Sequence, residues 1–385
     1  MRPVFCILFS IILLYGCKKE SDPGPDYACD CQPNGKNIFS LIIHQATALF
    51  PYENENHRWG YIDQNGSVIY NASYADAYSF SNNRAMVVDD KYGVQFAGFI
   101  DPEGTLAVPA KFRLVSEPYY SSEGLVPMGD VKKFVFGYID MTGQIVVPFQ
   151  YDYTSEFSEG LAVVYKNNKA GVIDINGNIV VPIKYESVTA FSEGLALVFQ
   201  VGEKRGYLTP QNQFKFQGDF IHGTIFMYGL AVVDDPKSQL FGFINTEGQF
   251  VIQPQFTAAY VFSEGLAAVQ FNNKWGFIDL SGNFVIEPQF DDVQIGFCGG
   301  LAPVMKNSRW GYIDRSGSFI ITPQFDYADI FYCDLAQVWF INGTVGYVNK
   351  SGGIVYRSTQ TLKEKPHLTK IADALSKYNI HVGND

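Results

Sequence analysis

The side chains that could perform chemistry in this sequence are mainly carboxylates at a regular spacing. An aspartate lies three residues before a glycine at several places, and paired carboxylates carry out acid and base catalysis in glycosidases. A carboxylate beside a turn glycine can instead accept hydrogen bonds from the backbone N–H groups of the turn. A catalytic site needs one unique constellation, whereas these residues recur. We therefore expect a structural role for Asp63, Asp101, Asp140, Asp174, Asp279 and Asp314.

The remaining reactive side chains match no catalytic or metal-binding pattern. Glutamates in a second recurring turn receive the same structural interpretation, at Glu123, Glu159, Glu193 and Glu264. The histidines are scattered without the spacing of metal ligands, and the phosphate-binding loop, G-x-S-x-G and H-E-x-x-H motifs are absent. The sequence therefore predicts no catalytic residue, no metal site, no cofactor and no enzymatic activity.

Two of the six cysteines occupy nearly matched positions one repeat apart. Cys298 and Cys333 would come within disulfide range if neighbouring repeats stack, and an oxidising compartment would permit the bond. The alternative is two separate buried thiols. Cys29 and Cys31 form a C-x-C pair, which has too few ligands for a complete metal site. That pair is interpreted as a local or intermolecular disulfide, or as free thiols.

A glycine that opens the pattern G-[YF]-I-D recurs along almost the whole chain, with a period of about 35 residues. Each unit contains three short pieces rich in β-branched and aromatic residues and bounded by glycine or proline, which predicts three strands per repeat. A fixed period of this size indicates stacked units rather than one catalytic domain. The leading glycines are Gly60, Gly98, Gly137, Gly171, Gly206, Gly242, Gly276, Gly311 and Gly346.

A second glycine follows the first at a constant interval and marks the turn between the first two pieces. Its recurrence predicts a left-handed backbone, as in a type I turn closed by a glycine bulge. The one departure is Asn212, and asparagine adopts positive φ more readily than other non-glycine residues. The predicted turn positions are Gly66, Gly104, Gly143, Gly177, Gly248, Gly282, Gly317 and Gly352.

These units resemble the WG repeats, also called KWG repeats, of bacterial proteins. The naming motif is present as Trp59-Gly60, Lys274-Trp275-Gly276 and Arg309-Trp310-Gly311, and the resemblance extends over residues 46–357. The other units carry different residues in place of the tryptophan. The resemblance implies tandem β units and no common activity.

The predicted fold is all-β, with residues 38–357 forming an array of about nine units. We expect an open or superhelical array, because each unit shows three strands whereas propeller blades usually have four. The alternative is a closed, propeller-like ring. Residues 358–385 form a tail in which Leu368, Ile371, Leu375 and Tyr378 recur at helical spacing, which predicts a short C-terminal helix.

The N-terminus has the pattern of a secretory signal. Arg2 precedes an apolar run, and Gly16-Cys17 resembles the lipobox of bacterial lipoproteins. The resemblance implies a signal peptide at 1–16, lipidation of Cys17, and a flexible tether at 17–37. The implied location is the bacterial outer membrane, lipid-anchored, with the protein either surface-exposed or facing the periplasm. The alternative is an ordinary secretory signal with a chance cysteine.

The formal net charge is −11, and removing residues 1–16 takes away Arg2 and no acidic residue, so the mature charge is −12. An acidic chain without a basic cluster binds nucleic acid poorly, because neutralising phosphates requires lysine and arginine. We therefore expect no nucleic-acid partner, and contact with the membrane only through the lipid anchor.

Two groups of residues could have a role in binding or catalysis rather than in structure alone. Trp59, Trp275 and Trp310 could stack on sugar rings, or they could fill the core between stacked hairpins. The unit from Thr209 to Gly229 loses the aspartate and the proline and carries His222, so it is either a degenerate repeat or the place of a nonstandard enzyme site. The favoured function is a non-enzymatic, envelope-anchored scaffold that binds an envelope or extracellular protein. The alternative is a cell-surface lipoprotein that binds a glycan.

Overall fold

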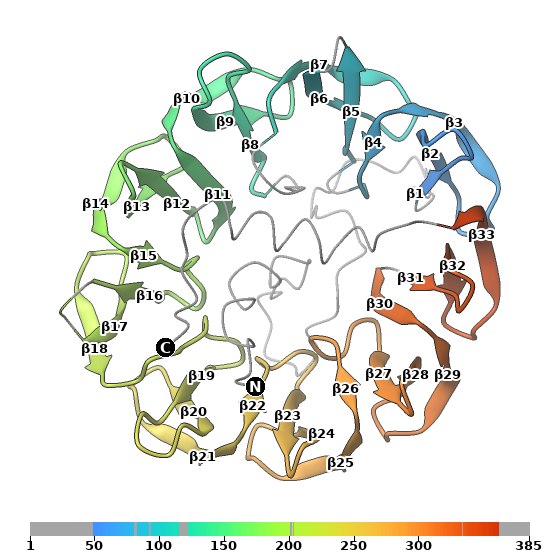
Figure 1. Cartoon of the computed structure of the whole chain (residues 1–385). Coiled ribbons are helices and arrows are strands. Elements are labelled where there is room, and N and C mark those ends of the chain that lie inside the picture. The colour runs from blue at the N-terminus through green and yellow to red at the C-terminus, as the bar shows by residue number, and fades with distance from the viewer. Residues whose placement is uncertain are drawn as a thin grey trace, which may run out of the picture.

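The computed structural model describes residues 49–361 except 81–82, 92–93, 115–121, 201, 203 and 333. Its strands form nine antiparallel sheets arranged as the blades of a closed ring, a β-propeller (Figure 1). The predicted signal peptide, Cys17, the tether and the C-terminal helix lie outside the described residues. Within the described part of the chain, no helix is long and apolar enough to cross a membrane.

The strands, grouped by sheet, have the following bounds. They are β1 (Phe50–Glu53), β2 (Trp59–Ile62) and β3 (Val68–Tyr74); β4 (Asp76–Ala77), β5 (Ala85–Lys91), β6 (Val94–Ile100) and β7 (Leu106–Phe112); β8 (Leu125–Gly129), β9 (Phe136–Asp140) and β10 (Ile145–Tyr151); β11 (Tyr153–Ser158), β12 (Leu161–Lys166), β13 (Lys169–Asp174) and β14 (Ile179–Tyr185); β15 (Ser187–Val188), β16 (Ala196–Phe199), β17 (Arg205–Leu208) and β18 (Phe214–Gly218); β19 (Leu230–Asp234), β20 (Phe241–Asn245) and β21 (Phe250–Phe256); β22 (Ala258–Ala259), β23 (Ala267–Phe271), β24 (Lys274–Ile278) and β25 (Phe284–Phe290); β26 (Asp292–Val293), β27 (Ala302–Lys306), β28 (Arg309–Ile313) and β29 (Phe319–Phe325); β30 (Tyr327–Tyr332), β31 (Leu335–Trp339), β32 (Thr344–Asn349) and β33 (Ile354–Thr361).

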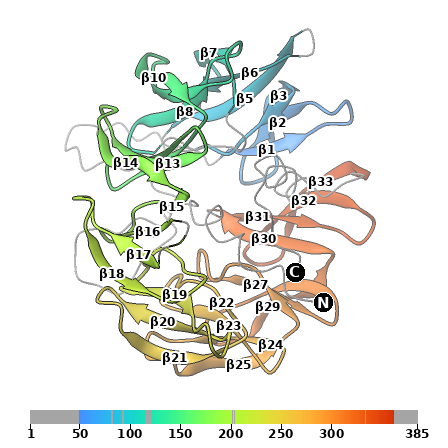
Figure 2. The same ribbon diagram turned by 60° about the vertical axis from the view of Figure 1, so that its left-hand side comes forward.

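Each sheet is a meander in which every strand pairs with the next strand along the chain, from the centre of the ring to its perimeter (Figures 1 and 2). Six sheets have four strands, so the prediction of three strands per repeat is wrong for them. The additional strand is the innermost one, and in four of the six sheets it is only two residues long, as in β22 and β26. A strand this short gives no alternating pattern from which it could be predicted.

The hydrophobic core consists of separate clusters, each lying between two neighbouring sheets. One cluster joins Phe256 of β21 to Val269 of β23, and another joins Phe290 of β25 to Val304 of β27. The first and last sheets share a cluster of the same kind, in which Phe50 packs with Tyr347. An open array would leave these two faces in water. The prediction of an open or superhelical array is therefore wrong, and its alternative, the closed ring, is confirmed.

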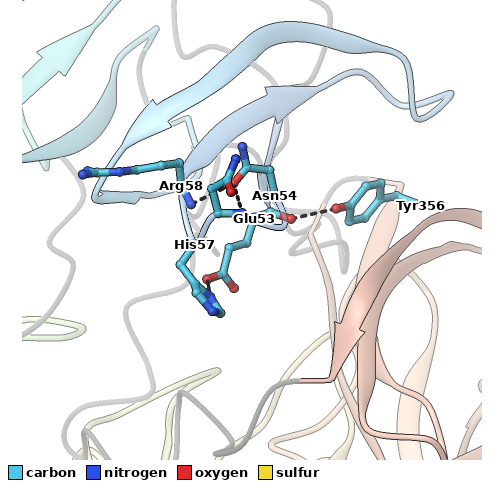
Figure 3. A network of polar contacts seen from close by, with 6 residues as sticks. Glu53, Asn54, His57, Arg58 and Tyr356 are labelled. Carbon is cyan, nitrogen blue, oxygen red and sulfur yellow. Dashed lines mark hydrogen bonds and ion pairs between the residues drawn. The ribbon is translucent and has the colours of Figure 1, made fainter.

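Side-chain hydrogen bonds complete the seam between the first and last sheets. The buried hydroxyl of Tyr347 donates to the Pro51 carbonyl at 2.9 Å, and the Tyr356 hydroxyl donates to the Glu53 carbonyl at 2.9 Å (Figure 3). The first contact repeats around the ring, where Tyr312 donates to the Asp329 carbonyl of the next sheet at 2.7 Å. The seam thus uses the same tyrosine position as an ordinary boundary between sheets, but its acceptor lies on β1 because the first sheet has only three strands.

Figure 3 also shows how the β1–β2 turn is held beside the seam. The Asn54 side chain accepts hydrogen bonds from the N–H groups of Asn56 and Arg58, at 2.9 and 3.0 Å. His57 has φ of 54° and its Nδ1 lies 2.8 Å from Glu53 Oε1. The turn therefore holds the strand whose Glu53 carbonyl receives the Tyr356 hydroxyl.

The recurring turn glycines serve both the turn and the packing of neighbouring sheets. All eight predicted positions have φ between 77° and 85°, and Asn212 has φ of 57°. A Cβ added to Gly143 would lie 2.9 Å from the Val108 side chain of the preceding sheet. At the seam, a Cβ on Gly66 would lie 2.2 Å from the Val355 carbonyl oxygen. A side chain at these positions would push neighbouring sheets apart.

Replacing Tyr347 with Phe should lower the free energy of unfolding by about 1–2 kcal/mol, because the buried Pro51 carbonyl loses its donor. Tyr312→Phe is the matched control, since it removes the equivalent bond between two interior neighbours. Urea unfolding should give similar losses for the two variants. A loss in Tyr312→Phe with none in Tyr347→Phe would contradict a closed seam.

Candidate binding surface

The recurring aspartates are occupied by the turns in which they lie. Asp140 Oδ1 accepts hydrogen bonds from the N–H groups of Thr142 and Gln144, both at 2.9 Å. The Thr142 hydroxyl donates to the same carboxylate and, with these N–H groups, lowers the pKa of Asp140. Equivalent pairs of backbone bonds hold Asp63, Asp174, Asp279 and Asp314. A carboxylate that accepts several hydrogen bonds from its own turn, as Asp140 does, is poorly suited to acid and base catalysis.

The second recurring turn is a two-residue hairpin with an unusual glutamate. Ser158-Glu159-Gly160-Leu161 joins β11 to β12, and both Glu159 and Gly160 have positive φ, 56° and 76°. Two consecutive left-handed residues define a type I′ turn, which favours asparagine, aspartate or glycine. A glutamate in this conformation is strained by roughly 1 kcal/mol or more. Some other interaction must offset that strain.

The offsetting interaction is a bond from each glutamate to the turn of the next sheet. Glu159 accepts hydrogen bonds from the N–H groups of Glu193 and Gly194, at 2.6 and 2.8 Å. Glu193 in turn accepts from Gly229 N–H at 2.9 Å. The adjoining serine makes a parallel link, since the Ser158 hydroxyl donates to the Phe191 carbonyl at 2.8 Å. Glu123 and Glu264 make the same connection to Gly160 and Gly299.

These glutamates link the inner turns of neighbouring sheets in a series of hydrogen bonds, which we call the relay and which the sequence did not predict. From the sequence, each glutamate was expected to act within its own turn. Its hydrogen bonds to the neighbouring turn can be recognised only from the packing of the sheets. The recurring sequence Phe-Ser-Glu-Gly is the feature from which these bonds could have been predicted. Glutamate rather than asparagine recurs at this left-handed position, which indicates a hydrogen-bond partner outside the turn.

The tryptophans belong mainly to the core. Trp275 and Trp310 are 3% and 7% exposed, and Trp275 stacks on Tyr260 with ring centroids 5.2 Å apart. Trp59 is partly buried against the cluster between the first two sheets. A sugar needs an exposed ring face, so the suggested role in stacking on a ligand is wrong for Trp275 and Trp310, and their alternative role in the core explains their positions.

The irregular unit uses His222 to anchor a buried carboxylate. Asp234 is 5% exposed, and its Oδ1 accepts from the N–H groups of Ile221 and His222, at 2.8 and 2.6 Å. Its Oδ2 lies 3.2 Å from His222 Nδ1. Burial alone raises the pKa of Asp234, but the hydrogen bonds from His222 and Ile221 outweigh burial and lower it. The pair holds the segment that enters the sheet β19–β21, where three strands replace the usual four.

Cys298 is buried and disulfide-bonded. Its predicted partner, Cys333, lies outside the described residues, so that pairing stays a prediction. Among the described residues, no group of three or more His, Cys, Asp or Glu side chains is placed to hold a metal ion.

The main apolar surface lies on the perimeter of the ring. Every outermost strand exposes at least one large apolar side chain near its start, with exposed fractions of 38–59%. We call these residues the apolar belt, and they are Val68, Ile69, Leu106, Ile145, Val146, Ile179, Phe214, Phe250, Val251, Val285, Ile320 and Ile354. The sequence gives no hint of this exposure, because Ile145-Val146-Val147 reads as one continuous buried run, although only Val147 is buried. These exposed apolar side chains recur on every outermost strand, which makes the perimeter the candidate binding surface of the ring.

The sequence matches the model of one protein family, described as "WG containing repeat". The matches cover residues 59–92, 136–169, 171–204, 241–275, 275–310 and 310–338, which together make up about half of the chain. No curated protein matches the sequence.

Solved structures with similar backbones have very different sequences. A structure titled "Crystal structure of the eukaryotic initiation factor" has a TM-score of 0.57 at 11% identity, covering 81% of this chain and 95% of that one. BamB from Moraxella catarrhalis has a TM-score of 0.40 at 11% identity, covering 63% of this chain and 84% of its own. The computationally designed Ika8 protein has a TM-score of 0.41 at 15% identity, covering 62% and 85%. The first of these supports the fold alone.

Replacing Asp140 with Ala should cost about 1–2 kcal/mol of stability, since two turn N–H groups lose a charged acceptor. Asp140→Asn is the matched control, because Asn245 accepts the equivalent N–H groups of Glu247 and Gln249, both at 3.0 Å. The pKa of Asp140 is lowered on folding, so the stability that its charge contributes is present above the usual carboxyl pKa. It should be lost as the pH falls toward the folded value, so the difference between wild type and Asp140→Asn should shrink in acid. A difference that does not change with pH would contradict this assignment.

Glu159→Ala should destabilise the ring by about 2 kcal/mol, because it removes two hydrogen bonds to the next sheet while the backbone strain of a non-glycine residue at positive φ stays as in the wild type. Glu159→Gly should cost less, since glycine relieves the backbone strain and Gly299 already occupies the matched position in another turn with φ of 63°. Thermal unfolding shows which of the two variants is the more stable. Equal stability of wild type and Glu159→Ala would show that the relay contributes nothing.

Proposed function

The chain belongs to the WG repeat family, and we propose that it is a non-enzymatic scaffold of the bacterial envelope whose ring presents its perimeter to other proteins. The observation that carries this proposal is the apolar belt, which occurs on all nine outermost strands of the described ring. A β-propeller with repeated surfaces suits protein interaction in general. Extended repeat surfaces bind proteins without any need for a catalytic constellation.

The rigidity of the ring supports the proposal. Each sheet is fixed to the next by a core cluster, and several are also fixed by glutamate and serine bonds between inner turns. A surface that does not rearrange loses little conformational entropy when it binds a partner. The belt is therefore presented in a fixed geometry, as a scaffold requires.

The proposed location follows from the N-terminal sequence. The pattern ending in Gly16-Cys17 supports lipidation of Cys17, and residues 17–37 would then tether the ring to the outer membrane. In this arrangement the partner is an envelope or extracellular protein, and the lipid is the only contact with the membrane.

The side chains described above support a non-enzymatic role. The turn aspartates and inner glutamates accept backbone hydrogen bonds, and Asp234 is held by three bonds from Ile221 and His222. Trp275 and Trp310, the residues suggested for stacking on a glycan, are buried, so they do not support a glycan-binding role. Only Phe214 and Phe250 of the belt are aromatic, and its other members are valine, isoleucine or leucine, which do not form the ring platforms that sugars prefer.

The proposal is tested by chemical crosslinking and capture from the native envelope, using soluble protein that lacks residues 1–17 as bait. We expect a saturable protein partner whose capture falls at least tenfold in the variant Ile145→Ser/Ile179→Ser. Ile341→Ser is the matched control, because Ile341 is 62% exposed but lies outside the belt. Capture of polysaccharide without protein would contradict the proposal, as would turnover that a point substitution abolishes in the folded ring.

A further inference from the structure

The outermost strand of every sheet is an edge, and most of these edges carry a feature that discourages further pairing. Proline interrupts six of them, because it cannot donate to a neighbouring strand, and charged side chains have a similar effect. The prolines are Pro109, Pro148, Pro182, Pro254, Pro288 and Pro323. Two further edges carry a cation: Lys215 of β18 pairs with Glu247 at 2.7 Å, and Arg357 of β33 lies 4.0 Å from the Phe340 ring centroid.

Strand β3 has neither kind of protection. Its sequence Val68-Ile-Tyr-Asn-Ala-Ser-Tyr74 contains no proline and no charged residue, and among the described strands it pairs only with β2. Val68 and Ile69 are 50% and 44% exposed, and Asn71 and Ser73 are exposed as well. A bare edge with apolar side chains is a template for another strand.

Asn71 occupies the position that proline holds in the neighbouring sheet. In the register of β2 with β3, Asn71 falls in the irregular stretch between Tyr70 and Tyr74. Pro109 falls in the same stretch of β7, between Val108 and Phe112. Because the fold tolerates proline at this point, the Asn71 N–H is not required for pairing with β2. It is therefore available to a strand that would add to the outside.

The charge beside β3 indicates what kind of strand would pair with it. The Tyr70 hydroxyl donates to the Pro102 carbonyl, so the turn containing Asp101 and Glu103 lies against the Tyr70 side chain of β3. Burial raises the pKa of Tyr70, and the nearby charges of Glu103 and Asp101 raise it further. These carboxylates favour a basic residue flanking the incoming strand. They disfavour a second copy of this chain, which is acidic overall and would bring the same carboxylates.

We propose that β3 is the docking site for an extended peptide segment of a partner protein, which adds to the sheet β1–β3 as a further strand. The segment has apolar side chains facing Val68 and Ile69 and a basic residue near Glu103. Backbone hydrogen bonds supply the affinity, and the alternating side chains supply the selectivity. This inference rests on the proposed scaffold function, and it adds an edge contact at β3 and a partner class to the contacts that the belt makes elsewhere.

The test compares Asn71→Pro with Asn71→Ala in the soluble protein that lacks residues 1–17. Asn71→Pro reproduces the arrangement of β7 and removes the outward N–H, whereas Asn71→Ala changes only the side chain. A displayed library of random peptides is selected on the wild type, and the selected peptides are then titrated against each variant. We expect extended, apolar sequences with flanking lysine or arginine, at least tenfold weaker binding to Asn71→Pro, and nearly unchanged binding to Asn71→Ala.

Two further measurements locate the binding. Hydrogen exchange should slow at residues 68–74 when peptide is bound, and Glu103→Gln should weaken binding and reduce its dependence on salt. Unchanged binding to Asn71→Pro would overturn the inference, and so would protection confined to another sheet or dimerisation of the ring through β3. Thermal unfolding checks that the Asn71→Pro ring remains folded, as the fold of β7 leads us to expect.

The envelope capture separates this inference from the proposed function. If the Asn71→Pro ring captures the same envelope protein as the wild type, the scaffold function stands and the β3 site is wrong. If the wild type itself captures no protein, the scaffold function fails.

Discussion

The structure depends on the fact that each sheet has two apolar faces. A single sheet of three or four short strands cannot bury both faces by itself, so each must pack against a neighbour on either side. Each of the nine boundaries between sheets of the described ring holds a hydrophobic cluster, and one of these boundaries lies between the first sheet and the last. An array of nine sheets with free ends would have only eight such interfaces. Closure therefore removes from water two apolar faces that would otherwise be exposed.

Close approach of the sheets explains several features that recur among the units. The turn glycines leave room for the side chain of the preceding sheet, as Gly143 does for Val108. The tyrosine hydroxyls and inner glutamates then satisfy backbone groups across the boundary, as Tyr312 and Glu159 do. Both faces of each sheet are occupied by its neighbours, whereas the outermost strand exposes apolar side chains at the perimeter.

Much of the local structure could be predicted from the sequence. The turn at Asp140 to Gly143 was recognisable because its aspartate and glycine have specific conformational roles, and the aspartate acts within its own turn. The number of strands could not be predicted, because an inner strand such as Ala258–Ala259 is too short to show an alternating pattern. The exposure of the belt could not be predicted either, because Ile145 and Val146 have the residue types of a buried core and only the structure shows that they are exposed. Ring closure depends on contacts such as Tyr347 with Pro51, which are distant in the sequence and leave no local pattern.

The measurement that tests the closed ring most directly is the distance between spin labels at Ser67 and Ser351, which flank the turn glycines of the first and last sheets. Labels at Ser281 and Ser318 serve as the reference, because they occupy matched positions on two interior neighbours and all four residues are exposed. The closed ring predicts that the two pairs give the same short and narrow distance distribution. A seam distance that is longer or broader than the reference would show that the first and last sheets do not meet.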